Sequence, residues 1–200
     1  NLLHGVTASG KTEIYIKLLE QYIKEGKQVL FLLPEIALTT QLVQRLTAYF
    51  GNEVAVFHSK YTNNERIEVW NQVLENSPKA KVVIGVRSAL FLPFSNLGCI
   101  IVDEEHEQTF KQHDPAPRYH ARDAAIVLAK QHGAKVVLGS ATPSLETYYN
   151  VQSNKYGLTE LKVRYGNVVL PEIQLVDLKD KYFRNKMSGH FSDELLEEIT

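Results

Sequence analysis

Eight residues near the start of the chain have the types and spacing of a loop that binds phosphate groups. They read GVTASGKT, fit the pattern G-x-x-x-x-G-K-[ST], follow an apolar run and precede helical spacing over residues 12–22. Glycines let the backbone curl until several N–H groups converge on phosphate oxygens, and the following helix adds the positive end of its dipole. The lysine adds a charge near the β- and γ-phosphates, and the final hydroxyl suits Mg²⁺. A glycine-rich turn that fits by chance is the alternative. We expect a nucleoside triphosphate to be cradled by Gly5, Val6, Thr7, Ala8, Ser9, Gly10, Lys11 and Thr12.

An acidic cluster, Asp103-Glu104-Glu105-His106, follows the apolar run 99–102. Such a cluster alone is more often a solvated turn, but a phosphate loop needs an acidic partner at the end of a nearby strand. We expect Asp103 to hold Mg²⁺ through water, together with Thr12, and Glu104 to orient and polarise the attacking water. This acidic run favours hydrolysis, because a kinase takes its nucleophile from the substrate. The predicted catalytic residues are therefore Lys11, Asp103 and Glu104.

Two further segments carry residue types that suit nucleic acid. Arg87 and Ser88 follow an apolar run, at the strand end where open α/β sheets bind ligands, and could contact a phosphate backbone. Pairing of Arg87 with a neighbouring carboxylate is equally open. Between residues 103 and 140, aromatic and basic side chains alternate, as in surfaces that stack bases, although an exposed loop with a buried tyrosine anchor would look the same. The candidates there are Arg118, Tyr119 and Arg122.

The elements that must position these residues follow an alternating order. Short apolar runs are typical of strands buried on both faces of a parallel sheet and occur at 29–33, 54–57, 81–84, 99–102 and 136–138. Helical spacing occupies 38–49, 67–74 (after the capping-type residues Asn63 and Asn64) and 121–131. This order predicts a three-layer α/β domain of the P-loop NTPase type, with a mostly parallel central sheet. After residue 149 we expect strands at 158–163 and 173–176, a polar, basic linker at 179–189 and an amphipathic helix from residue 193.

Composition sets broad limits on the protein class. The chain has 200 residues, 44% hydrophobic and 22% charged, which is ordinary for one globular domain, and its net charge of −1 argues against a uniformly basic nucleic-acid coat. No apolar run reaches the roughly 18 residues of a membrane helix, and no secretory leader is recognisable. The single cysteine, Cys99, excludes an internal disulfide and fits a reducing cytosol, so we expect a cytoplasmic protein. The first residues read as a strand already under way and the last as an interrupted helix, so we expect a fragment of a longer protein.

Six motifs in order resemble one helicase family. They are GVTASGKT (5–12), PEIALTTQ (34–41), GVRSALFLPF (85–94), DEEH (103–106), PRYHARD (117–123) and GSATPSLET (139–147). Together they are similar to the first RecA-like motor domain of the primosomal protein N′ (PriA) family, superfamily 2 DNA helicases that restart stalled replication forks. The resemblance runs from about residue 1 to residue 179. GVRSALFLPF and PRYHARD are much more specific to the family than the phosphate loop, because generic helicases lack them.

The resemblance implies a function and its parts. It implies ATP-driven 3′-to-5′ movement on DNA with Mg²⁺, unwinding at branched or forked DNA, and contact with single-stranded DNA. Residues 5–12 would be helicase motif I, 103–106 motif II, and 140–142 motif III, which links the ATP site to DNA. The segments 34–41 and 85–90 would be motifs Ia and Ib, and 117–123 a DNA-sensing loop. Primosome proteins and single-strand-binding proteins are the implied partners, with no membrane.

The same resemblance sets the expected boundaries and departures. Residues 1–178 would form the first motor domain, and 179–200 a linker with the truncated start of the second. The family's second motor domain, with its arginine finger, and its zinc-binding cysteines lie outside this sequence, so we expect zinc only in the full-length protein and weak activity from the fragment. Ala8 stands where the family has Gly and restricts the loop if that position needs positive φ, and Thr40 replaces a usual Pro. A small-molecule P-loop kinase and a non-enzymatic, nucleotide-gated DNA-binding module are the alternative functions.

Overall fold

The computed structural model describes residues 1–35, 41–58, 61–167 and 173–199. Two compact units divide the chain, Asn1–Asn167 and Val168–Thr200. None of the helices in the described part of the chain has the length and apolar character needed to cross a membrane.

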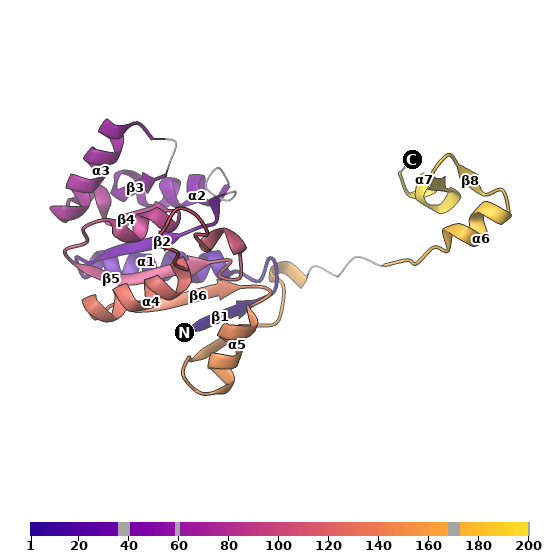
Figure 1. The fold of residues 1–200 in the computed structure, drawn as a ribbon. Helices are drawn as coiled ribbons and strands as arrows, with labels where there is room; N and C mark the ends of the chain where they lie inside the picture. The colour runs from indigo at the N-terminus through magenta and orange to yellow at the C-terminus, as the bar shows by residue number, and fades with distance from the viewer. Residues whose placement is uncertain (36–40, 59–60, 168–172, 200) are drawn as a thin grey trace. The chain divides into compact units, whose positions relative to one another are not determined.

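A parallel sheet forms the centre of the first unit (Figure 1). Its strand order is β3-β4-β2-β5-β6-β1-β7, and every neighbouring pair is parallel. Parallel strands leave their carboxyl ends at one edge, so the loops that follow β1, β4, β5 and β6 lie at the same edge. The strands are β1 Leu2–Gly5, β2 Gln28–Leu32, β3 Val54–Phe57, β4 Val82–Gly85, β5 Leu97–Asp103, β6 Lys135–Ser140 and β7 Leu158–Leu161.

Helices cover both faces of this sheet and complete three layers. Successive side chains of a strand point to opposite faces, and β2 shows this directly. Leu30 and Leu32 belong to one core cluster with α3 and α4 residues, whereas Val29 and Phe31 belong to another with α1 and α2 residues. The predicted three-layer α/β fold is therefore confirmed. The helices of this unit are α1 Lys11–Lys24, α2 Gln41–Phe50, α3 Asn63–Leu74, α4 Ala121–His132 and α5 Leu145–Gln152.

The start and the buried face of α3 differ from the prediction. Its N-cap is Thr62, whose hydroxyl accepts a hydrogen bond from the backbone N–H of Glu65, while the Glu65 carboxylate accepts one from the Thr62 N–H at 2.7 Å. This capping box replaces the predicted cap at residues 63–64. Val69 and Val73 are the buried apolar residues, because α3 carries apolar side chains on two faces. The face used for the prediction is exposed and carries Ile67, Trp70 and Leu74.

The described part of the second unit, residues 173–199, contains two helices and a small hairpin. Helix α6 spans Leu178–Phe183, α7 spans Asp193–Ile199 as predicted, and β8 (Met187–Ser188) pairs antiparallel with β9 (Phe191–Ser192). The segment expected to be a linker thus contains α6, whose first N–H groups are capped by Asp177. The strand predicted at 173–176 does not form: Ile173 and Leu175 are exposed, and no strand in the described part of the chain pairs with this segment. That residues 179–200 lead into a second motor domain stays a prediction.

Candidate nucleotide-binding site

The phosphate loop joins β1 to α1, as its sequence predicts. Gly10 precedes the first helical residue at φ 91°, a left-handed conformation that favours glycine. The Lys11 ammonium donates a hydrogen bond to the carbonyl of Gly5 at 2.8 Å, so the lysine folds back over its own loop. The Ser9 hydroxyl is buried and has no hydrogen-bond partner among the residues that the structure describes. A loop with an unpaired buried hydroxyl and a lysine held on a carbonyl is ready to receive oxygen ligands.

Ala8 occupies the position where the sequence raised a question of backbone strain. Its φ is 60°, in the left-handed region that disfavours residues with a Cβ. The loop therefore requires positive φ at residue 8, which is the condition under which alanine was expected to restrict it. The Ala8 carbonyl accepts a hydrogen bond from the Tyr165 N–H at 2.8 Å, which ties the strained residue to the segment after β7.

The phosphate loop and the acidic pair meet in one pocket. This pocket has a volume of about 200 Å³ and is lined by Thr7, Ala8, Ser9, Gly10, Lys11, Thr12, Asp103 and Glu104. The meeting follows from the sheet order, since β6 is the neighbour of both β1 and β5. Among the described residues, no group of three or more His, Cys, Asp or Glu side chains could hold a metal ion. Thr12 and Asp103 are the lining residues whose oxygen atoms were predicted to serve Mg²⁺.

Asp103 ends β5 and is held by a residue that the sequence did not single out. The Tyr15 hydroxyl donates a hydrogen bond to Asp103 Oδ1 at 2.8 Å. Residue 139 must be glycine for this contact, because a Cβ there would lie 1.7 Å from the Tyr15 oxygen. Burial raises the pKa of Asp103, against the opposing effects of the Tyr15 hydrogen bond and the Lys11 charge. Burial and the charge of Asp103 also raise the pKa of Tyr15, so its hydroxyl stays a donor.

Glu104 follows directly, in a backbone conformation that is rare for its type. Its φ is 50°, and such outliers gather at functional sites. Burial raises the pKa of the Glu104 carboxyl, and the charge of Asp103 raises it further, while Lys11 and His106 lower it. A half-buried carboxylate with a raised pKa beside a phosphate loop is suited to accept a proton.

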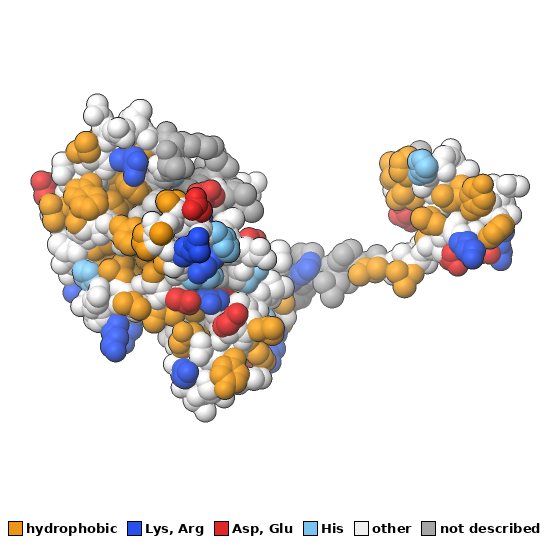
Figure 2. Space-filling model, viewed as in Figure 1, with side chains coloured by type: hydrophobic (Ala, Val, Ile, Leu, Met, Phe, Trp, Pro, Cys, Tyr) orange, Lys and Arg blue, Asp and Glu red, His pale blue; other side chains and the backbone are white. Residues whose placement is uncertain are grey.

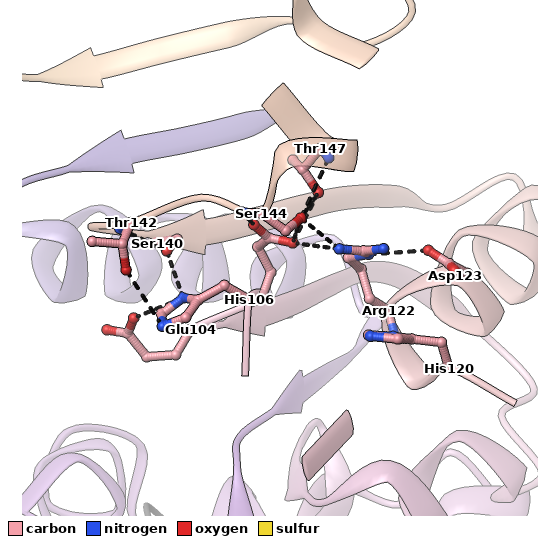
Figure 3. Close-up of polar contacts among 10 residues, drawn as sticks. Glu104, His106, His120, Arg122, Asp123, Ser140, Thr142, Ser144 and Thr147 are labelled. Atoms are coloured by element: carbon pink, nitrogen blue, oxygen red, sulfur yellow. Dashed lines mark hydrogen bonds and ion pairs between the residues drawn. The ribbon is translucent and has the colours of Figure 1, made fainter. Parts of the chain in front are cut away.

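His106 connects the acidic cluster to the end of β6 (Figure 3). Its Nδ1 lies 2.8 Å from Ser140 Oγ, and its Nε2 lies 3.4 Å from Thr142 Oγ1. The same ring lies 3.7 Å from the Glu104 carboxylate. Ser140 Oγ also accepts a hydrogen bond from the Thr142 N–H at 3.0 Å. The structure therefore brings the segments assigned as motifs II and III into direct side-chain contact.

Glu105 is fully buried and forms the centre of a polar cluster, whose members Arg122, Ser144 and Thr147 are labelled in Figure 3. It accepts hydrogen bonds from the Ser144 N–H at 2.7 Å, the Thr147 hydroxyl at 2.8 Å and Arg122 Nη1 at 3.1 Å. Arg122 also donates through Nε to Asp123 at 3.0 Å. Burial alone would lower the pKa of Arg122, but its hydrogen bonds to Asp123 and Glu105 raise it overall. The cluster joins the end of β5 to the first turns of α4 and α5.

This cluster holds Arg122, one of the residues predicted to contact nucleic acid, and that contact stays a prediction. Only 9% of the Arg122 side chain is exposed, and its guanidinium is already bonded to two carboxylates and to the Ser144 hydroxyl at 2.6 Å. From the sequence, an arginine in the first turn of a helix is expected to be exposed. Arg122 is buried because it pairs with Glu105, whose side chain lies in the interior.

The other predicted nucleic-acid residues lie elsewhere in the first unit. Arg118 is exposed, and Tyr119 and Ser88 are partly buried. Arg87 donates to the carbonyl of Thr109 at 2.9 Å, and the Tyr119 hydroxyl donates to the carbonyl of Arg87 at 3.4 Å. Arg87 and Tyr119 thus come together through a hydrogen bond to the backbone. Their contact with DNA stays a prediction.

An apolar groove borders one of these residues. Figure 2 shows hydrophobic side chains gathered over the region of α3. The groove has a volume of about 480 Å³, and its lining combines exposed apolar residues of α3 with the segment after β4. Ser88 belongs to this lining, so a predicted DNA contact lies on the rim of an apolar surface. The lining residues are Phe57, Asn63, Arg66, Ile67, Trp70, Ser88, Phe91 and Leu92.

Comparison with known proteins identifies the class. A family model described as DEAD/DEAH box helicase matches residues 1–151. The chain belongs to the DEAD/DEAH box helicase family.

Individual relatives narrow the class further. The chain is 47% identical over 198 residues to the replication restart protein PriA of Bacillus subtilis, covering 99% of this chain and 24% of that protein. It is 51% identical over 187 residues to the replication restart protein PriA of Haemophilus influenzae, covering 94% of this chain and 25% of that protein. The chain therefore spans about a quarter of the length of these relatives. The resemblance to the PriA family is confirmed, and the chain is a helicase motor domain similar to part of PriA.

Solved structures agree in fold. RecG bound to a three-way DNA junction matches with a TM-score of 0.58 at 22% identity, over 81% of this chain and 20% of that chain. The C-terminal domain of S. cerevisiae Dbp5, bound to Gle1 and IP6, matches with a TM-score of 0.58 at 14% identity, over 80% of this chain and 88% of that chain. At these identities the likeness shows the RecA-like fold alone, and this agrees with the predicted architecture.

Proposed function

We propose that this chain is the ATP-binding motor domain of a DNA helicase that moves 3′ to 5′ and acts in the restart of stalled replication forks. The observation that carries the proposal is the single pocket in which Lys11 and Thr12 meet Asp103 and Glu104. A phosphate loop joined to an acidic pair in this way is the arrangement of a nucleoside-triphosphate hydrolase. Relatives that bear the name replication restart protein support the cellular role.

The residues of the pocket fit ATP with Mg²⁺. The unpaired Ser9 hydroxyl and the N–H groups at the start of α1 offer donors to phosphate oxygens. The Lys11 ammonium, now 2.8 Å from the Gly5 carbonyl, can exchange that weak acceptor for a charged phosphate. Asp103 and Thr12 are the protein groups for Mg²⁺, whose charge would neutralise the phosphate oxygens. Tyr15 fixes which Asp103 oxygen stays available, because it occupies Oδ1.

Glu104 is the residue that would act on the attacking water. Its position next to Asp103 places a second carboxylate in the same pocket, and its raised pKa favours proton uptake. The His106 ring then links this carboxylate to Ser140 and Thr142. We assign this link to the communication between ATP hydrolysis and movement on DNA.

For DNA contact we propose Arg87, Ser88, Arg118, Tyr119 and Arg122, of which Arg122 is buried in its ion pairs with Glu105 and Asp123. The segments of Arg87 and Tyr119 are joined by a hydrogen bond, and Arg118 is exposed next to them. Forked DNA and single-stranded DNA are the proposed substrates. Primosome proteins and single-strand-binding proteins are the proposed partners, and the cytoplasm is the proposed location.

A kinase or a non-enzymatic module would give different results in one assay. We expect forked DNA to stimulate ATP hydrolysis by the full-length protein that contains this domain. Lys11→Ala should abolish hydrolysis and weaken ATP binding, whereas Glu104→Gln should abolish hydrolysis and retain binding, since it removes the base and keeps the cradle. Lys17→Ala, which removes an exposed lysine of the same helix, is the matched control and should behave like wild type.

The outcomes separate the alternatives. Phosphoryl transfer to a small molecule without any effect of DNA would establish a kinase. ATP binding with DNA binding but no hydrolysis would establish a non-enzymatic module. We also expect the isolated chain to hydrolyse ATP poorly, because a second motor domain would complete the site. Rapid DNA-stimulated turnover by the isolated chain would contradict this expectation.

A further inference from the structure

A second pocket lies directly beside the phosphate loop. It has a volume of about 560 Å³ and is lined by Ala8, Gly10, Thr12, Glu13, Arg45 and Tyr165. Three of these residues, Ala8, Gly10 and Thr12, also line the pocket assigned to the phosphates. The two pockets therefore share a wall formed by the loop. If the phosphates of a nucleotide occupy the first pocket, its ribose and base must lie outside that pocket. The second pocket is adjacent and can receive them.

Backbone hydrogen bonds fix Tyr165 against the loop. Strand β7 pairs with β1 so that Leu161 is the partner of Gly5, the first loop residue. Beyond this pair, the Val6 N–H donates to the Leu161 carbonyl at 3.2 Å, and the Tyr165 N–H donates to the Ala8 carbonyl at 2.8 Å. The end of β7 and the segment after it therefore lie along the phosphate loop. Its last contact sets the position of an aromatic side chain that is 85% exposed.

A charged pair from two helices contributes polar groups to the same pocket. Glu13 lies in the first turn of α1 and forms an ion pair with Arg45 of α2. Both side chains are 52% exposed, so each keeps polar atoms open to solvent. The pocket thus combines one exposed aromatic ring with a carboxylate acceptor and a guanidinium donor. Ligand sites commonly combine an apolar surface with a few placed polar groups in this way.

We infer that this pocket binds the base and ribose of the nucleotide, with the base stacked on the Tyr165 ring and the polar edge of the nucleoside facing Glu13 and Arg45. The inference rests on the proposed ATP binding and adds the residues that recognise the nucleoside. Stacking uses the face of a base, so it tolerates any base and favours the larger ring system of a purine. Tyr165 lies two residues before the end of the first unit, so a base stacked on its ring would contact the last segment of this unit.

The test compares two ligands that differ only in the nucleoside. Binding of Mg-ATP and of magnesium tripolyphosphate to the full-length protein is measured by calorimetry for wild type, Tyr165→Ala and Tyr165→Phe. Tyr165→Ala should weaken ATP binding by about 5- to 150-fold, the range expected for loss of one stacked base, and leave tripolyphosphate binding unchanged. Tyr165→Phe should bind both ligands like wild type. The preference for ATP over UTP should also fall in Tyr165→Ala alone.

Two controls separate this inference from the function on which it rests. Tyr149→Ala removes a tyrosine of the same unit that is 66% exposed and should leave all affinities unchanged. Lys11→Ala should weaken both ligands, and its failure to do so would overturn the phosphate site together with the nucleoside pocket. Equal ATP affinity in wild type and Tyr165→Ala, with Lys11→Ala still impaired, would overturn the nucleoside pocket alone. Loss of both ligands by a Tyr165→Ala protein with unchanged thermal unfolding would also overturn it.

Discussion

Arg122 has two carboxylate partners that differ in burial, and they should differ in their contribution to stability. Glu105 is fully buried and Asp123 is 63% exposed, yet both lie within hydrogen-bond distance of the same guanidinium, at 3.1 and 3.0 Å. Replacing Glu105 by Gln removes the buried charge and keeps nearly the same shape. Replacing Asp123 by Asn removes the exposed charge from the same arginine. The two variants therefore compare a buried carboxylate with an exposed one, and Arg122 is the partner in both cases.

The expected costs follow from the surroundings of each carboxylate. Breaking a buried ion pair typically costs about 3–5 kcal/mol, because the remaining charge stays buried without compensation. Glu105→Gln should approach this range, since it leaves the Arg122 guanidinium 9% exposed and puts an amide donor among the N–H and hydroxyl groups that now point at the carboxylate. Asp123→Asn should cost less than about 1 kcal/mol, the usual value for an exposed pair. For a domain of this size, the melting temperature falls by about 2–4 °C for each kcal/mol.

Urea unfolding followed by tryptophan fluorescence measures this difference directly. The only tryptophan of the chain, Trp70, lies in α3, so the signal reports the first unit. A double variant, Glu105→Gln with Arg122→Met, should recover part of the loss, because it removes the charge that has lost its buried partner. Equal costs for Glu105→Gln and Asp123→Asn would refute the reasoning. So would a double variant as unstable as the sum of its two single variants.

Three further predictions concern the loop and its acidic partner. Tyr15→Phe should raise the Mg²⁺ concentration needed for half-maximal ATP hydrolysis several-fold, because Asp103 loses the donor at 2.8 Å, whereas a purely structural role would lower stability without changing the Mg²⁺ requirement. Ala8→Gly should raise the free energy of unfolding in urea by about 0.5–1 kcal/mol, since release from left-handed strain of about 1–2 kcal/mol outweighs the added chain entropy. Ala124→Gly, within α4, is its control and should lower that free energy by about 1 kcal/mol. Because burial raises the pKa of Asp103 in the folded state, this group favours folding at pH values below its unfolded pKa, and that contribution is lost as the pH rises through the folded pKa. Asp103→Asn should therefore gain stability over wild type as the pH rises from 4 to 7.5 in urea titrations, and a constant difference would contradict this.

The sequence predicts those parts of the site that depend on local backbone geometry. The phosphate loop needs glycine at Gly10 and a helix directly after it, and both are visible in eight consecutive residues. Parallel strands that are buried on both faces have nearly continuous apolar runs, so the predicted strand positions agree with the observed ones within a few residues. Once strands and helices alternate, the carboxyl ends of the strands must share one edge. The meeting of Lys11 with Asp103 and Glu104 follows from that rule.

Contacts between distant buried groups could not be predicted in the same way. Tyr15 has the spacing of a core residue of α1, and nothing in the sequence tells where its hydroxyl finds a partner 88 residues away. A buried tyrosine nevertheless needs such a partner, so its presence on the apolar face was a usable signal. Arg122 poses the opposite problem, because its type suggests a surface contact while Glu105 pairs with it in the interior. Charge patterns along a chain do not distinguish these two cases.

The sequence pattern also gave a wrong strand prediction at residues 173–176, because a strand requires a neighbouring strand to pair with. Residues 173–176 have β-type composition but do not form a strand, since strand hydrogen bonds must be completed by another segment. In contrast, Leu158–Leu161 has a similar composition and does form β7, because β1 offers it a free parallel edge. The difference lies in the availability of a partner and not in the residues themselves.

In the acidic cluster 103–106, two of the four residues are held by hydrogen bonds in the interior, and Glu104 faces the pocket. Asp103 is held by Tyr15, and Glu105 is held by hydrogen bonds from α4 and α5, so both ends of the turn are anchored in the interior. Between and after them, Glu104 faces the pocket and His106 faces Ser140. A displacement at the end of β6 therefore reaches the cluster through the His106 ring, which lies 3.7 Å from the Glu104 carboxylate. Because the neighbours of Glu104 are fixed, such a displacement would change the position of the residue that orients water more than that of the Mg²⁺ ligand beside it.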